Sequence, residues 1–155
     1  LGALAIAMAC VPADQAPLPC SIDVRLLTGP ELLTGSTRLK AGTATKMALN
    51  ILSTGVMVKL GKVYGNRMVD VAASNSKLVD RSIRILRDLL GLDREAALSL
   101  LECAQGSVKR ALCMGSCRLG AEEADALLAA HSSDLRSALR SQGRSLPVQD
   151  SALPQ

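Results

Sequence analysis

The stretch TGPELLTGSTRLKAGTATK, residues 28–46, constrains the fold of this chain more than any other part of the sequence. Its first half combines flexible glycines with a carboxylate, hydroxyls and two cations, and a helical pattern begins near residue 39. A helix N-terminus offers unpaired backbone N–H groups and the positive end of a dipole, so the loop predicts a site for a phosphate or a polar sugar. The alternative is that Ser36 or Thr37 only caps the helix, while Arg38 and Lys40 are solvated. The candidate ligands are Glu31, Ser36, Thr37, Arg38 and Lys40.

Two short apolar segments precede this loop and predict strands. Residues 3–9 form an apolar run followed by a proline-containing turn, a pattern typical of buried strands in a parallel sheet. Residues 22–27 alternate and then become apolar, which indicates a second strand with one partly exposed face. After the loop, apolar residues spread around much of the circumference over residues 39–60 and predict a long helix that is buried on several sides.

The remaining sequence predicts short helices. A polar link at 61–68 is followed by helical periodicity from Ser76 to a stop at Gly91. Sliding the chain against itself by 27 residues reveals a repeat, and each copy predicts two helices that pack against the other copy. We expect the first helices to begin near Asp93 and Ala121, and the second helices near Gly106-Ser107 and Ser132-Ser133. The predicted domain limits are residues 1–75 and 76–142, with a flexible tail at 143–155.

The composition excludes several classes of protein. The chain has no Phe or Trp and one Tyr, so its core must be aliphatic. A net charge of +4 at pH 7 comes from basic and acidic residues mixed along the chain, so we expect no nucleic-acid partner. Cys113, Cys117 and His131 lack the second close pair typical of structural zinc sites, so we expect free thiols and no metal. The apolar opening segment has no basic region before it and is shorter than a membrane span, so no membrane association is expected.

Residues 29–46 closely resemble the signature shared by bacterial N-acetylmuramic acid 6-phosphate etherases and the glucokinase regulatory protein. The likeness continues through 49–55, 61–66 and 68–71 into 75–78, and these later segments resemble the etherase branch rather than the regulator. It covers roughly residues 1–140. The matching residues of the signature are Gly29-Pro30-Glu31, Thr34-Gly35-Ser36-Thr37-Arg38-Leu39-Lys40-Ala41-Gly42-Thr43-Ala44 and Lys46.

The resemblance implies an α/β fold that is mostly helical in this chain. Residues 1–75 would be the C-terminal part of a sugar-isomerase-type doubly wound parallel sheet, and 76–142 a small all-α domain similar to ubiquitin-associated folds. In such sheets ligands bind beyond the carboxyl ends of the strands, where the 28–40 loop would lie. The implied activity is that of a cytoplasmic carbon–oxygen lyase in peptidoglycan recycling. It would cleave the D-lactyl ether of N-acetylmuramic acid 6-phosphate to N-acetylglucosamine 6-phosphate and D-lactate.

In that family the catalytic glutamates and the phosphate-gripping loop lie upstream of the segment resembled here. We therefore interpret the chain as a C-terminal fragment that has no catalytic residue of its own and is inactive alone. The resemblance implies homodimers and no metal or organic cofactor. Truncation of a sheet predicts unpaired strand edges and bare apolar faces that promote association. Two alternatives are a non-catalytic regulator that binds a sugar phosphate, and an interaction module built on the repeat.

Overall fold

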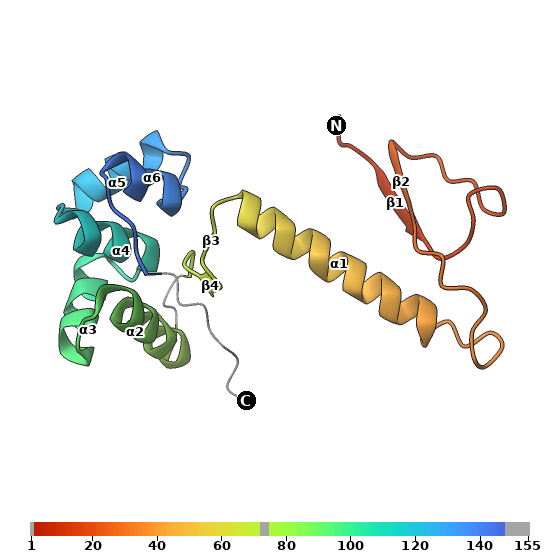
Figure 1. Cartoon of the computed structure of the whole chain (residues 1–155), viewed down its shortest axis with the longest axis horizontal. Coiled ribbons are helices and arrows are strands. Elements are labelled where there is room, and N and C mark those ends of the chain that lie inside the picture. Colours follow the sequence, from red (N-terminus) through yellow and green to blue (C-terminus); the bar gives the residue numbers. More distant parts are fainter. Residues whose placement is uncertain (1, 72–74, 148–155) are drawn as a thin grey trace. The chain divides into compact units, whose positions relative to one another are not determined.

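The computed structural model describes residues 2–71 and 75–147, and the chain divides into two compact units, residues 1–56 and 57–155 (Figure 1). The described residues form six helices and two small sheets of two strands each. The predicted mixed α/β content is therefore confirmed at this level. The domain limits predicted from the sequence, residues 1–75 and 76–142, divide the chain at a different point from these two units. They stay a prediction.

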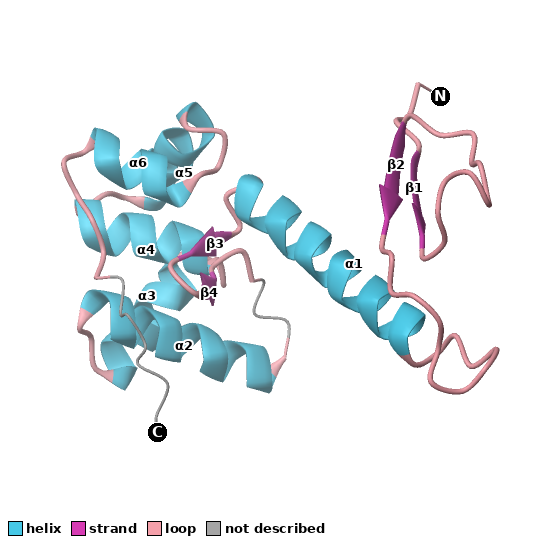
Figure 2. Ribbon diagram, turned by 45° about the vertical axis from the view of Figure 1, so that its right-hand side comes forward, coloured by secondary structure: helices cyan, strands magenta, loops and turns pink. Residues whose placement is uncertain are grey.

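The first unit contains a parallel pair of strands. β1 (Ile6–Ala9) and β2 (Ile22–Arg25) lie side by side with Ile6 opposite Ile22 (Figure 2). The guanidinium of Arg25 donates to the carbonyl oxygens of Val11, at 3.1 Å, and Ala16, at 2.8 Å, and so holds the connection between the strands. Both predicted strands are present, each shorter than the apolar segment that predicted it.

The loop leads into α1 (Lys40–Lys59), whose ends lie within one residue of the predicted helix. One face of α1 carries small, half-buried side chains, among them Ala41 and Thr45. At this face the Cys10 sulfur, next to the end of β1, lies 3.4 Å from Thr45 Oγ1 and 3.6 Å from the carbonyl oxygen of Ala41. The small residues therefore permit a close approach between the strand end and the first half of the helix.

The expectation that α1 is buried on several sides is wrong for this chain. No residue of α1 is buried, and the side chains of Met47 and Ile51 are 60% and 70% exposed. The physical reason is that apolar side chains surround the helix, whereas within its own unit the described residues offer only a two-stranded sheet to pack against. The small-residue face is covered, and the large apolar residues are not.

The second unit is a helical bundle with a hairpin at its start. The link at 61–68, predicted only as polar, forms β3 (Val63–Tyr64) and β4 (Arg67–Met68), joined by a turn in which Gly65 has a φ of 59°. Among the helices α4 contacts α2, α3, α5 and α6 and is central (Figures 1 and 2). The helices are α2 (Ser76–Leu90), α3 (Arg94–Cys103), α4 (Val108–Cys117), α5 (Ala121–Ala130) and α6 (Leu135–Ser141).

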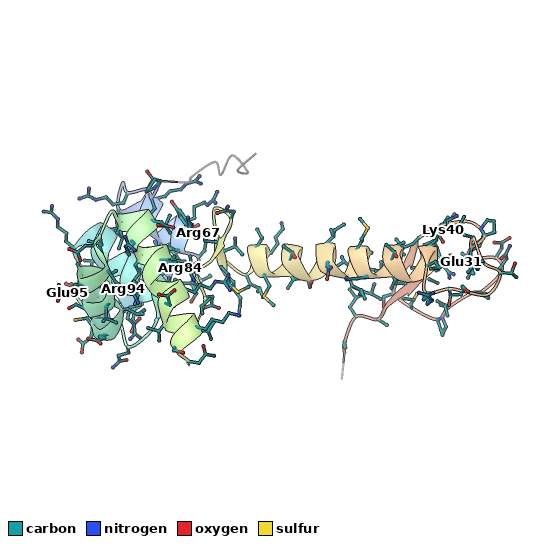
Figure 3. All side chains as sticks on the ribbon, turned by 90° about the horizontal axis from the view of Figure 1, so that it is seen from below. Glu31, Lys40, Arg67, Arg84, Arg94 and Glu95 are labelled. Atoms are coloured by element: carbon teal, nitrogen blue, oxygen red, sulfur yellow. The ribbon has the colours of Figure 1, made fainter. Side chains whose placement is uncertain are left out.

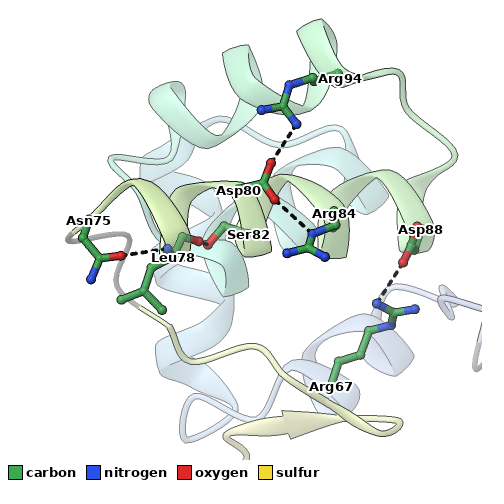
Figure 4. Close-up of polar contacts among 8 residues, drawn as sticks. All are labelled: Arg67, Asn75, Leu78, Asp80, Ser82, Arg84, Asp88 and Arg94. Carbon is green, nitrogen blue, oxygen red and sulfur yellow. Dashed lines mark hydrogen bonds and ion pairs between the residues drawn. The ribbon is translucent and has the colours of Figure 1, made fainter.

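Helix α2 begins and ends at the predicted residues. The Asn75 side chain accepts a hydrogen bond from the Leu78 N–H at 2.9 Å (Figure 4). Gly91 ends the helix with a φ of 69°. Two further contacts fix the neighbours of α2: Asp80 pairs with Arg94 of α3, and Arg67 of the hairpin pairs with Asp88. The hairpin, which precedes α2 in the sequence, and α3, which follows it, are thereby both held to α2.

The repeat gives the bundle its core. Helices α5 and α6 begin 27 residues after α3 and α4, which confirms two helices in each copy. Equivalent positions are buried in both copies, so each copy covers the apolar face of the other without a ligand. The buried equivalents are Ala97, Leu101, Val108, Ala111 and Leu112 in the first copy, and Ala124, Leu128, Leu135, Ala138 and Leu139 in the second.

Two details at the end of the chain differ from the sequence-based predictions. The cap of α6 is Asp134 rather than Ser132 or Ser133, because both serines adopt a positive φ, at 52° and 60°, in the turn before the helix. The tail predicted from residue 143 includes one residue that is held in the structure, and its limits stay a prediction. Leu146 is only 7% exposed, and its backbone N–H and carbonyl both bond to the Tyr64 hydroxyl. Residues 148–155 of that predicted tail lie outside the described residues.

Candidate functional site

The loop before α1 is closed by Glu31. One oxygen of its carboxylate accepts the backbone N–H of Lys40 at 2.8 Å, and the other accepts the N–H of Ala41 at 2.9 Å (Figure 3). These two bonds hold the pKa of Glu31 below its usual value, and the bond from Ala41 has the largest effect. The positive charge of Lys40 lowers the pKa further. The Lys40 ammonium donates to the carbonyl oxygen of Pro30 at 3.0 Å. Glu31 and Lys40 therefore join the two ends of the loop.

The next two N–H groups of α1 also have partners. Gly42 donates to the carbonyl oxygen of Thr37 at 2.8 Å, and Thr43 donates to that of Leu39 at 3.2 Å. A Cβ atom at position 42 would lie 3.2 Å from the same Thr37 oxygen, so glycine permits this close turn. An anion at the end of α1 would have to displace Glu31, and the helix terminus is thus not an open phosphate site.

Ser36, Thr37 and Arg38 lie at the outer part of the loop. Ser36 is half-buried, whereas Thr37 and Arg38 are exposed. Within residues 2–71 and 75–147, none of these three side chains forms a hydrogen bond or an ion pair. The hydroxyls do not cap the helix, which corrects the alternative interpretation of the loop. Their binding of substrate stays a prediction.

A cleft of about 520 Å³ in the second unit was not predicted as a site. Lys109, 6% exposed, donates to the carbonyl oxygen of Ser133 at 2.9 Å and lies 3.7 Å from the carboxylate of Asp70. Lys62 pairs with the other oxygen of that carboxylate at 3.0 Å. Burial alone raises the pKa of Asp70, but the two lysines outweigh it and hold the pKa below its usual value. Each charge here has a partner, which favours a structural role for the cluster.

Other residues noted from the sequence have structural positions. Tyr64 is buried by the chain near Leu146, and His131 ends α5, as expected for a cap residue. All five cysteines are free. Within the described residues no group of three or more His, Cys, Asp or Glu side chains is placed to hold a metal ion. None of the helices in this part of the chain has both the length and the apolar character needed to cross a membrane.

Comparison with known proteins confirms the resemblance predicted from the loop. A protein of Synechococcus sp. strain CC9902, named N-acetylmuramic acid 6-phosphate etherase, is 71% identical over 146 residues, which is 94% of this chain and 46% of that protein. A protein of the same name from Nostoc sp. strain PCC 7120 is 64% identical over 140 residues, or 90% of this chain and 46% of the relative. No family model matches the chain. The chain thus spans about half the length of the relatives it matches.

Proposed function

We propose that this chain supplies the C-terminal portion of an N-acetylmuramic acid 6-phosphate etherase. The observation that carries the proposal is the identity of 71% over 146 residues with the Synechococcus etherase. The Synechococcus and Nostoc relatives are both named as etherases, which favours the enzyme over the regulatory alternative. The reaction would be cleavage of the D-lactyl ether to give N-acetylglucosamine 6-phosphate and D-lactate. Its place would be amino-sugar recycling in the cytoplasm, with the enzyme a homodimer.

The exposed apolar residues of the first unit support the proposal that its sheet is incomplete. Parallel strands are usually buried on both faces, yet Ile6 of β1 and Ile22 of β2 are 55% and 43% exposed. Met47 and Ile51 of α1 are also exposed, and exposed apolar groups of this kind indicate a missing partner surface. We propose that these residues belong to a sugar-isomerase-type sheet. The part of the relatives that this chain does not match would complete it.

The loop at 28–40 would present the substrate-binding residues. Glu31 and Lys40 are proposed to position the loop, since both already bind its two ends. Ser36, Thr37 and Arg38 are the members that retain donors for a sugar phosphate. Arginine binds phosphate oxygens in a bidentate manner, so Arg38 is the strongest candidate ligand. The acid and base that the elimination needs are proposed to lie outside this chain.

The test uses D-lactate release from N-acetylmuramic acid 6-phosphate. This chain alone should release none. A chimaera in which the unmatched part of the Synechococcus protein precedes residue 1 should be active. In the chimaera Arg38→Ala should raise KM, while Lys59→Ala, which removes an exposed cation at the far end of α1, should change nothing. Release by the chain alone would contradict the assignment of the catalytic residues, and an unchanged KM and kcat for Arg38→Ala would remove Arg38 from the site.

A further inference from the structure

A second cleft lies in the helical bundle. It lies where the chain after α6 returns to the hairpin, a path that can be followed in Figure 1. Its volume is about 150 Å³, and Tyr64 is one of the residues that line it. Tyr64 is 4% exposed and is fixed by two hydrogen bonds of its hydroxyl, to the carbonyl oxygen of Leu146 at 3.1 Å and from the N–H of Leu146 at 2.9 Å. Tyr64 is therefore held in position beside the cleft.

Three arginines line this cleft. Arg136 and Arg140 lie one turn apart on α6, and the Arg136 guanidinium carbon lies 5.5 Å from the centre of the Tyr64 ring. Arg144 follows a turn in which its N–H donates to the carbonyl oxygen of Leu139 at 2.9 Å. That turn brings the third guanidinium to the same cleft, together with the hydroxyl of Ser145.

Among the described residues, no carboxylate pairs with the side chains of this cluster. The lining residues include no carboxylate, and none of the three arginines forms an ion pair with any of the residues described. Asp134, the cap of α6, interacts electrostatically with Arg136 but does not line the cleft. Other arginines of the bundle differ, since Arg94 and Arg110 each have an aspartate partner. Like charges one helix turn apart repel, so the arrangement favours an external anion.

We propose that this cleft binds a phosphate-type dianion, either inorganic phosphate or the phosphate group of a monoester. Three guanidinium groups offer more positive charge and more N–H donors than a single carboxylate can use. The small volume suits one tetrahedral group rather than a peptide segment. The cleft is formed by residues of the second unit, whereas the loop at 28–40 belongs to the first, and the proposal does not rest on the proposed etherase function.

Tyr64 provides a reporter for this site because it is the only aromatic residue of the chain apart from His131. Its fluorescence should change with saturation as sodium phosphate is added to the full chain, and not with sodium chloride at the same ionic strength. Line broadening in the ³¹P spectrum of the added phosphate gives an independent readout. A parallel titration with glucose 6-phosphate distinguishes the two sources of the phosphate group, and tighter binding of either identifies the preferred one.

The variants decide whether the arginines carry the binding. Arg140→Ala should weaken phosphate binding at least about tenfold, because a charge-assisted hydrogen bond is lost. Arg144→Gln should also weaken phosphate binding at least about tenfold, and because residue 144 follows α6, this substitution does not alter that helix. Arg87→Ala removes an exposed arginine of α2 that does not line the cleft, and it should leave the affinity within about twofold. The proposal is overturned by equal responses to phosphate and chloride, by an equal response to acetate, or by unchanged affinity in both cleft variants.

Discussion

Replacing Tyr64 with Phe removes the one oxygen atom that joins the hairpin to the end of the described chain. The Tyr64 hydroxyl donates to the carbonyl oxygen of Leu146 and accepts from the N–H of Leu146, across 82 residues of sequence. Each such bond contributes about 0.5–1.5 kcal/mol net, and both Leu146 groups would lose their partner in a buried place. We therefore expect the free energy of unfolding to fall by about 2 kcal/mol. For a unit of this size the melting temperature should fall by about 8–16 °C.

The assay is urea unfolding followed by far-ultraviolet circular dichroism, which reports the helices of the bundle. Ser99→Ala is the matched control, because it removes an exposed hydroxyl from α3 and should change stability by less than about 0.5 kcal/mol. A loss for Tyr64→Phe no larger than that of the control would show that Leu146 is not held by Tyr64 in solution. The flexible tail would then begin at residue 143, as the sequence suggested.

Two further predictions concern the bundle. Gly61→Ala should destabilise it by about 2–3 kcal/mol in the same urea assay, because the new Cβ would lie 2.9 Å from the Asp134 Cα at a φ of +64°. Gly143→Ala, at the same φ but in open space, should lose only about 1 kcal/mol, and equal losses would refute the proposed clash. Asp70 has a lowered pKa in the folded chain, so its stabilisation is present above pH 3.8 and is lost as pH falls through the lower folded pKa. Asp70→Asn should therefore flatten the loss of stability below about pH 4, and an unchanged acid transition would exclude this aspartate as its source.

Local structure was predictable where it depends on neighbours in sequence. The ends of α1 and α2 followed from apolar periodicity and from the glycine at position 91, whereas the Asn75 cap was seen only in the structure. The cap of α6 was missed by one residue because a left-handed turn occupies Ser132 and Ser133, and serine rarely signals that conformation. The burial of α1 was misjudged for a different reason. Its apolar residues specify a helix with several neighbours, but residues in the described part of its unit cover only the small-residue face.

The candidate loop is predicted from its residue types, and the substrate-binding roles of its members stay predictions. The structure adds a role that the sequence does not indicate, since the Glu31 carboxylate accepts the N–H groups of Lys40 and Ala41. A carboxylate nine residues before a helix gives no sequence signal for such a cap, because the usual capping residue is adjacent to the first turn. The exposed position of Arg38 agrees with its type, since an arginine without an acidic neighbour remains solvated.

The sequence by itself determined the helices, the first two strands, the repeat and the resemblance, because each of these depends on residues close together in the chain. The hairpin of β3 and β4 was not predicted. Tertiary structure alone decided which charges meet. Lys62 and Asp70 flank one hairpin, but Lys109 comes from α4, and no spacing in the sequence relates it to the other two. The same is true of the arginine cleft, which is lined by Tyr64 and by residues that follow it 70 residues or more later. Such contacts arise only when the two copies of the repeat pack and return the end of the chain to its hairpin, since packing sets the distances between remote residues.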